Sequence, residues 1–189
     1  MKKIILAFAL LAFSFNSFAQ LDSNEWYLSF GVNAINNLGT QSPINSPDDW
    51  AFNKVPVSAA VEFSWSRQFS IEQSITLNGF TTSSIVDGNT INKELDYVSF
   101  DTHVKYYFGQ YLFPNADWID FFANAGVGFY HIDETNISGN LGGGVLFWLN
   151  GDRTFGLRAQ AISKFALDAS DSGYDNNHFQ YHLQATIRL

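Results

Sequence analysis

Apolar and polar residues alternate with a period of two along most of the chain. The pattern is clearest over residues 178–189, where odd-numbered residues are apolar and even-numbered residues are polar. Strict alternation places the two sets on opposite faces of a strand, whereas a helix would scatter both around its circumference. The sequence therefore predicts eight strands, because weaker forms of the pattern occupy seven other segments, at 26–33, 57–65, 69–78, 98–108, 120–129, 141–149 and 155–164.

The lengths of these strands and of their connections indicate a membrane barrel. Each predicted strand has about ten residues, the length that a tilted strand needs to cross a bilayer. Short turns on one side, longer loops on the other and an even number of strands are typical of outer-membrane barrels. The predicted fold class is all-β, an eight-stranded antiparallel up-and-down transmembrane β-barrel. Its short turns lie at 66–68, 109–117 and 150–153 and its long loops at 36–55, 81–96 and 166–177, and the connection at 132–136 is short where a long one is expected.

The same alternation also suits a soluble β-sandwich or a lipocalin-like barrel, and the charged residues help to choose between them. The polar register holds four acids and four bases, and a balanced set suits a closed lumen in which each charge needs a partner. Aromatic residues gather near the short turns, as in interfacial girdles. Both observations favour the membrane barrel. The charges are Glu62, Glu72, Asp101, Asp120, Lys105, Lys164, Arg158 and Arg188, and the aromatic residues are Trp26, Trp65, Phe69, Tyr106, Phe108, Phe121, Phe147 and Phe155.

Some residues break the alternation. Gln73 and Thr102 are polar in the apolar register, and Leu146 and Trp148 are apolar in the polar register. In a membrane barrel the first two would face lipid and the second two would face the lumen.

The composition fits a membrane barrel and disfavours several other classes of protein. The 189 residues are 46% hydrophobic, 17% aromatic and only 15% charged, below the roughly 25% charged residues of an ordinary soluble domain. So high an apolar content rules out a disordered chain. A net charge of −8 without a basic run argues against nucleic-acid binding, and the lack of cysteine excludes disulfides and thiolate metal sites.

The first residues have the order of a secretory signal peptide. Lys2 and Lys3 precede an apolar run at 4–13, and Ser17-Phe18-Ala19 has the small residues of a cleavage site. The expected domains are a signal peptide at 1–19 and an outer-membrane β-barrel domain at 20–189. No later segment approaches about 18 consecutive apolar residues, so no membrane-spanning helix is expected.

Four charged residues form the main candidate site. Glu62, Glu72, Lys105 and Arg158 fall at similar distances from the short turns. Side chains fill the interior of an eight-stranded barrel, so a wide pore is not expected. The four residues are therefore predicted to form an interior salt-bridge cluster with a structural role.

No catalytic, cofactor-binding or metal site is expected. His178 and His182 share a strand face, but the rise of a strand separates them by about 13 Å, too far to share one metal ion. His131, Glu134 and Ser138 flank one outer hairpin and contain the residue types of a lipid hydrolase. Their neighbours have the composition of an ordinary turn, so the chain is predicted not to be an enzyme.

Motifs spread over nearly the whole chain carry a family resemblance. They are F-A-Q at 18–20, W-Y-L-S-F-G-V-N-A at 26–34, S-P-D-D-W-A-F-N at 46–53, S-I-E-Q-S-I-T-L-N-G-F at 70–80, D-T-H-V-K-Y-Y-F at 101–108, N-A-G-V-G-F at 124–129 and the final strand. Together they resemble OmpA-type outer-membrane barrel proteins of Bacteroidota. The resemblance implies an eight-stranded barrel with periplasmic termini, inserted by the barrel assembly machinery. The chain stops at Leu189, so the peptidoglycan-binding domain of many members is not carried over, and Leu189 departs from their usual aromatic last residue.

The expected function follows from the barrel and from its acidic loops. The predicted outer loops hold ten acids and two bases, Lys54 and Lys93. Such an excess of acids suits either a solvated rim or a site for divalent cations that bridge to lipopolysaccharide. We expect a structural outer-membrane protein that contributes to envelope integrity and displays surface loops, with outer-membrane lipid and lipopolysaccharide as partners, no nucleic-acid partner and a monomeric state. A narrow channel for small solutes and a soluble periplasmic lipocalin-like binder remain as alternatives. The loop acids are Asp48, Asp49, Asp87, Glu94, Asp96, Asp133, Glu134, Asp168, Asp171 and Asp175.

Overall fold

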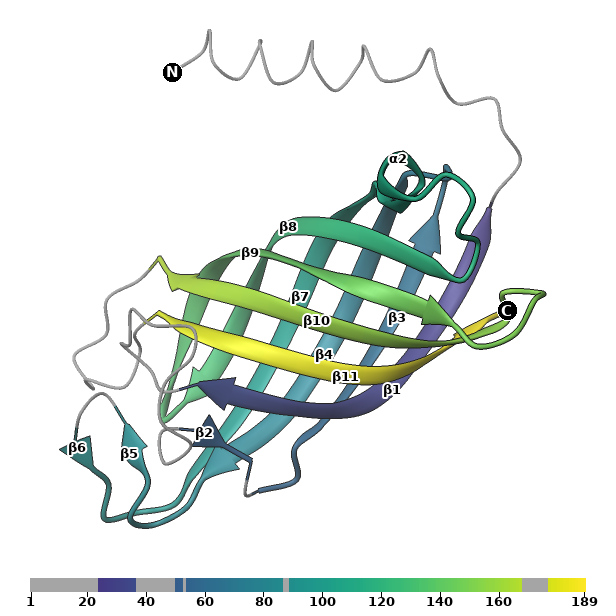
Figure 1. The fold of residues 1–189 in the computed structure, drawn as a ribbon. Coiled ribbons are helices and arrows are strands. Elements are labelled where there is room, and N and C mark those ends of the chain that lie inside the picture. Colours follow the sequence, from purple (N-terminus) through teal and green to yellow (C-terminus); the bar gives the residue numbers. More distant parts are fainter. Residues whose placement is uncertain (1–23, 37–49, 53, 87–88, 168–176) are drawn as a thin grey trace, which may run out of the picture.

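Eight long strands form a closed antiparallel barrel (Figure 1) in the computed structural model, which describes residues 24–36, 50–52, 54–86, 89–167 and 177–189. Strands that follow one another around the ring are paired, and β1 also pairs with β11, which closes it. The predicted eight-stranded up-and-down barrel is therefore confirmed. The barrel strands are β1 (Glu25–Asn36), β3 (Val57–Ser64), β4 (Phe69–Phe80), β7 (Leu95–Tyr107), β8 (Ile119–Ile132), β9 (Glu134–Trp148), β10 (Phe155–Ala166) and β11 (His178–Arg188).

Four short elements accompany the barrel. Strand β2 (Trp50–Ala51) pairs with the last residues of β1, and β5 (Ile85–Val86) and β6 (Asn89–Thr90) form a hairpin between β4 and β7. The helix α2 (Gly109–Leu112) follows β7. In the described part of the chain, no helix is long and apolar enough to cross a membrane. The expected signal peptide at 1–19 lies outside the described residues.

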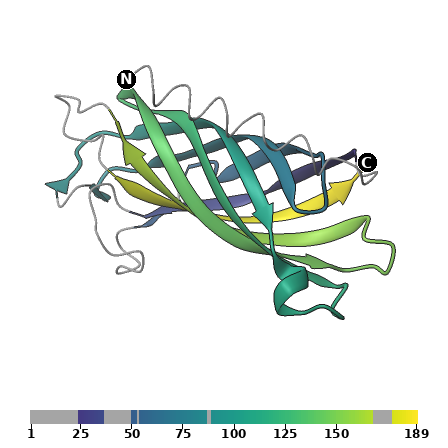
Figure 2. The same cartoon turned by 90° about the horizontal axis from the view of Figure 1, so that it is seen from above.

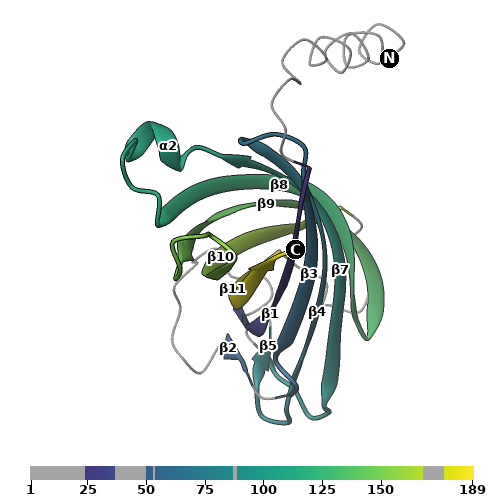
Figure 3. The same cartoon turned by 90° about the vertical axis from the view of Figure 1, so that its right-hand side faces the viewer.

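The two ends of the barrel differ in their connections. At one end, here called the turn end, short turns join the strands, and the backbone N–H of Leu189 donates to the carbonyl of Trp26. The opposite end, the loop end, carries β2 and the β5–β6 hairpin. Figure 2 shows this hairpin and α2 at opposite ends of the barrel, and Figure 3 shows α2 beside the rim of the turn end.

The strands reach further toward the loop end than the apolar alternation indicates. Strand β9 begins at Glu134, seven residues before the predicted start at 141, and β8 continues to Ile132. Only Asp133, with a φ of 62°, separates the two strands. Backbone hydrogen bonds can continue a ladder where the side chains no longer alternate between apolar and polar, so the alternation marks only part of each strand.

The outer wall is apolar and has an aromatic belt at the turn end. Trp26, Phe30 and Val127 are each half exposed or more. The predicted girdle residues contact one another across neighbouring strands, with Phe69 and Tyr106 at 5.1 Å between ring centroids. The belt continues through the contacts of Trp26 with Phe63, Trp65 with Phe69, Tyr106 with Phe108, Phe108 with Phe121 and Trp118 with Phe147.

Candidate functional site

The barrel interior brings together the four charges predicted from the sequence, here called the four-charge cluster. Glu62 on β3 and Glu72 on β4 are direct cross-strand neighbours, an arrangement that would be repulsive by itself. Lys105 Nζ lies 3.0 Å from Glu62 Oε2 and 2.5 Å from Glu72 Oε2. Arg158 reaches the same two oxygens at 2.8 and 2.7 Å. Each base therefore contacts both acids, and the four formal charges cancel.

Neutral side chains add hydrogen bonds to Glu62 and Arg158 in this cluster. The hydroxyls of Ser70 and Tyr107 donate to Glu62 Oε1 at 2.6 and 2.7 Å. Arg158 also donates twice to Gln184 Oε1, and the Gln184 amide donates to Ser58. All four charged residues are at most 2% exposed, so a buried charge here is stabilised only through these partners. Neither Tyr107 nor Gln184 is charged, and the sequence gives no signal for their part in the cluster.

A second ion pair lies nearer the loop end. Lys164 on β10 donates to Asp101 on β7 at 2.5 Å, and both residues are fully buried. Asn140 and Ser99 also donate to Asp101, at 2.9 and 3.0 Å. The sequence predicted that both charges face the lumen but did not predict that they meet. Position 128 on the neighbouring β8 is glycine, where a Cβ atom would lie 1.9 Å from Asp101 Oδ1.

His103 lies between the two charged groups. Its Nε2 is 3.3 Å from the Asn140 amide, beside Asp101, and its Nδ1 is 3.8 Å from Glu72 Oε1. The lumen therefore contains an almost continuous row of polar groups from Lys164 to Arg158. The members of this row are buried.

The other two histidines of the lumen have separate hydrogen-bond partners. His178 bonds to the hydroxyl of Tyr97 at 2.7 Å, and His182 lies 3.3 Å from Gln180 Oε1. Within the described ranges, no group of three or more His, Cys, Asp or Glu side chains is arranged to hold a metal ion.

The loop end of the lumen contains an apolar cap that sequence reasoning missed. The cap consists of residues that are at most 3% exposed: Ile35, Ala51, Phe80, Val86, Ile91, Leu95, Tyr97, Tyr130 and Ile132. The polar register of several strands ends on one of these apolar residues, such as Phe80 on β4 and Ile132 on β8. That change of polarity at the strand ends is the signal from which the cap could have been predicted. The remaining members come from β2 and from the segment around the β5–β6 hairpin.

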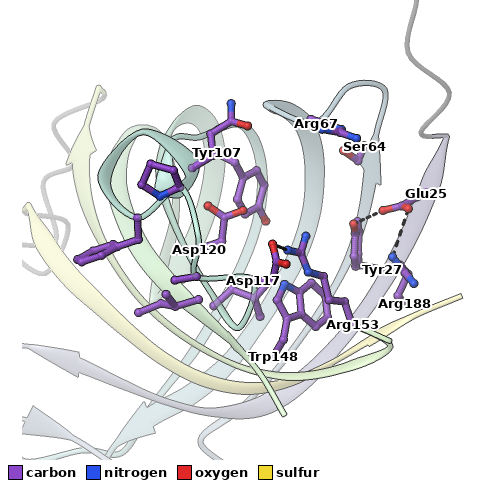
Figure 4. A pocket seen from close by; sticks show the side chains of 16 residues that line it. Glu25, Tyr27, Ser64, Arg67, Tyr107, Asp117, Asp120, Trp148, Arg153 and Arg188 are labelled. Atoms are coloured by element: carbon purple, nitrogen blue, oxygen red, sulfur yellow. Dashed lines mark hydrogen bonds and ion pairs between the residues drawn. The ribbon is translucent and has the colours of Figure 1, made fainter. Parts of the chain in front are cut away.

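The turn end is open by comparison. A cavity of about 570 Å³ occupies this mouth of the lumen and is lined by both charged and aromatic side chains (Figure 4). Glu25 accepts a hydrogen bond from Tyr27 and lies 3.4 Å from Arg188, while Arg153 pairs with Asp117. Trp148, one of the apolar exceptions in the polar register, also lines the cavity. The Tyr107 hydroxyl links this cavity to Glu62 and hence to the four-charge cluster.

The hydrolase-like residues are not brought together. Ser138 is completely buried and donates to Asn140, whereas His131 is exposed and contacts Thr135 at 3.0 Å. Because the two residues lie in opposite registers of adjacent paired strands, they occupy opposite faces of the wall. Glu134 is exposed at the start of β9. The His131 imidazole is therefore not placed to activate the Ser138 hydroxyl.

The two bases of the loop end form ion pairs with nearby acids. Lys54 lies 2.9 Å from Glu94 and 2.7 Å from Asp96, and Lys93 lies 2.6 Å from Asp133. Both bases of the acidic loops thus contact acids of the same rim. The loop acids Asp48, Asp49, Asp87, Asp168, Asp171 and Asp175 lie outside the described residues.

Comparisons with known proteins identify the same architecture. No family model and no curated protein sequence matches the chain. Ail, the attachment invasion locus protein of Yersinia pestis, is similar in structure, with a TM-score of 0.52 and 15% identity over 89% of this chain and 100% of Ail. The N-terminal β-barrel domain of Pseudomonas aeruginosa OprF has a TM-score of 0.57 at 8% identity, covering 88% of this chain and 100% of that domain. Neisserial surface protein A has a TM-score of 0.56 at 10% identity, covering 88% of this chain and 97% of its own. At such identities the similarity shows the fold alone.

Proposed function

We propose that the chain is a structural, non-enzymatic protein of the outer membrane that supports envelope integrity and displays its loops at the cell surface. The observation that carries this proposal is a lumen filled by paired charges and closed at the loop end by the apolar cap. Such an interior stabilises a closed wall and offers no wide aqueous path. Its structural neighbours from outer membranes support the same placement.

The apolar outer wall supports the membrane placement over a soluble lipocalin-like binder. Large side chains such as Phe30 and Val127 are more than half exposed, and an aromatic belt surrounds the turn end. Exposed apolar surface of this extent is unfavourable in water and favourable in lipid. We extend the proposal to the N-terminus, where residues 1–19 would be a cleaved signal peptide, and to OmpA-type membership, insertion by the barrel assembly machinery and contact with lipopolysaccharide.

Migration on a gel tests the membrane placement directly. The folded protein should migrate differently before and after boiling, because a membrane barrel remains folded in detergent until it is heated. It should also float with lipid vesicles. Protein that stays soluble and monomeric without detergent would overturn the placement.

A second set of measurements separates a structural role from a channel. Cells that lack the protein should become more permeable to detergents and large antibiotics, and Arg158→Lys, which keeps the positive charge, should restore the barrier. Purified protein in planar bilayers should give no single-channel conductance, because the apolar cap crosses the lumen at the loop end. Reproducible conductance steps would favour the channel instead. An unchanged barrier in the deletion strain would contradict the structural role.

A further inference from the structure

Gln73 and Thr102 form a polar pair in the otherwise apolar outer wall. Gln73 lies between Ile71 and Ile75 on β4, and Thr102 lies between Phe100 and Val104 on β7. The two residues are direct cross-strand partners, and the Gln73 amide donates a hydrogen bond to Thr102 Oγ1. The surrounding residues Val61, Ile71, Ile75, Phe100 and Val104 are each 38–46% exposed. These were the two polar exceptions in the apolar register, and nothing in the proposed function uses them.

The hydrogen bond between these residues leaves further bonding capacity facing outward. A Gln side chain has two N–H donors and a carbonyl acceptor, and a Thr hydroxyl that accepts a bond still has a proton to donate. Among the described residues, no second hydrogen bond to the Gln73 side chain is formed. In hydrocarbon, where water does not reach, such groups are costly unless a neighbouring protein surface satisfies them.

The arrangement of this pair is complementary to a copy of itself. A two-fold axis parallel to the barrel axis, just outside the wall and level with the boundary between β4 and β7, would place β7 of one copy opposite β4 of the other. Thr102 could then donate its remaining proton to the carbonyl of Gln73 in the second copy, and the reverse bond would form by symmetry. The result is a closed ring of four hydrogen bonds, two within the copies and two between them.

The shape of the wall beside this pair fits the same arrangement. A shallow groove of about 390 Å³ lies next to Thr102 and is lined by Val104, Ala123, Ala125 and Leu141, among others. In the two-fold arrangement this side of one copy faces β3 and β4 of the other, where Val61 and Ile71 project, Ile71 being the β4 partner of Val104. The small alanines give room for those branched side chains to pack.

We infer that the β4–β7 wall is the interface of a homodimer within the membrane, with a second copy of this chain as its occupant. The inference rests on the proposed membrane placement, and it departs from the monomeric state expected from the sequence. Gln73 and Thr102 together act as the polar centre of the interface, and the groove beside Thr102 receives apolar side chains of the second copy.

Association in vesicles tests this interface. The chain contains no cysteine, so Asn115→Cys at the exposed β7–β8 connection gives a single site for donor or acceptor dyes. In vesicles of phosphatidylethanolamine and phosphatidylglycerol, energy transfer should fall as lipid dilutes the protein. Gln73→Leu and Thr102→Val should each lower the association constant roughly tenfold, because both intermolecular bonds are lost. Thr102→Ser should restore association because it keeps the hydroxyl, and Leu183→Val on the opposite β11 wall should have no effect.

The controls separate failure of the dimer from failure of the membrane placement. Gln73→Leu makes the outer wall more apolar, so the variant should still fold, show heat-dependent migration and float with vesicles. Protein that does not float would contradict both the membrane placement and the dimer. Floating protein without energy transfer, or an association constant unchanged by Gln73→Leu and Thr102→Val, would overturn the dimer alone.

Discussion

The two halves of the lumen stabilise their buried side chains in different ways. Toward the turn end, two acids and two bases contact one another in all four combinations. Toward the loop end, a single pair, Asp101 and Lys164, lies below an apolar cap. A cluster with shared partners distributes each charge over two opposite charges, whereas Asp101 and Lys164 each have one opposite charge, and neutral donors supply the other hydrogen bonds of Asp101. The aliphatic members of the cap need no polar partner, but they depend on close packing.

Arg158→Leu should have the largest effect because it removes one partner from each of two buried acids. Glu62 and Glu72 would then share Lys105 alone, and a net negative charge would remain in the lumen. The expected loss is about 3–5 kcal/mol of unfolding free energy. Urea unfolding in detergent measures it, and Arg158→Lys should lose less. Unchanged stability would show that the four-charge cluster has no structural importance.

Asp101→Asn should have the next largest effect. The amide still accepts a hydrogen bond from Lys164, but it no longer balances the lysine charge, so we expect a loss of about 2–3 kcal/mol. Adding Lys164→Met removes the unpaired charge, and the double variant should lose less than the sum of the single variants. Additive losses in the same unfolding assay would show that the two residues are not energetically coupled.

Ile35→Val tests the apolar cap at a residue with no exposed surface. Removing one buried methylene should cost about 0.5–1.5 kcal/mol. The loss should not depend on pH or salt, because neither the isoleucine nor the valine side chain is charged. The outer-wall substitution Ile75→Val is a matched control, and it should cost less because Ile75 is 42% exposed. Equal losses at the two positions would contradict a packed cap.

Lys54→Met should have the smallest effect, because this ion pair lies at the surface of the loop end. Hydrogen bonds to Asp96 and Glu94 raise the pKa of Lys54 above its usual 10.5. A pKa that is raised in the folded state means that the ion pair stabilises the fold fully at neutral pH. This stabilisation is lost as the pH rises above 10.5 and through the pKa of the folded state. Midpoints of urea unfolding should therefore converge for the parent and Lys54→Met above about pH 10.5, and high salt should reduce their difference at pH 7. A difference that persists at high pH would contradict this assignment.

Much of the wall could be predicted from the sequence because period two fixes which face each residue occupies. Glu62, Glu72, Lys105 and Arg158 share the inward register and a similar depth, and the structure brings them together. Strand ends were less predictable. Strand β9 starts seven residues before its predicted start, because its first residues do not alternate between apolar and polar. The sequence disfavoured a catalytic role for Ser138, and the inward position of its side chain shows why His131 does not reach it.

The alternation along the chain by itself determined the number of strands, the apolar outer wall and the inward direction of the charges. Only the tertiary structure decided which of those charges meet. Asp101 and Lys164 are 63 residues apart, and their contact depends on how the strands are staggered when the barrel closes. The same holds for the cap, whose members come from separate strands and from the segment around the β5–β6 hairpin. Local periodicity sets the face of a side chain, while ring closure sets its neighbours across the lumen.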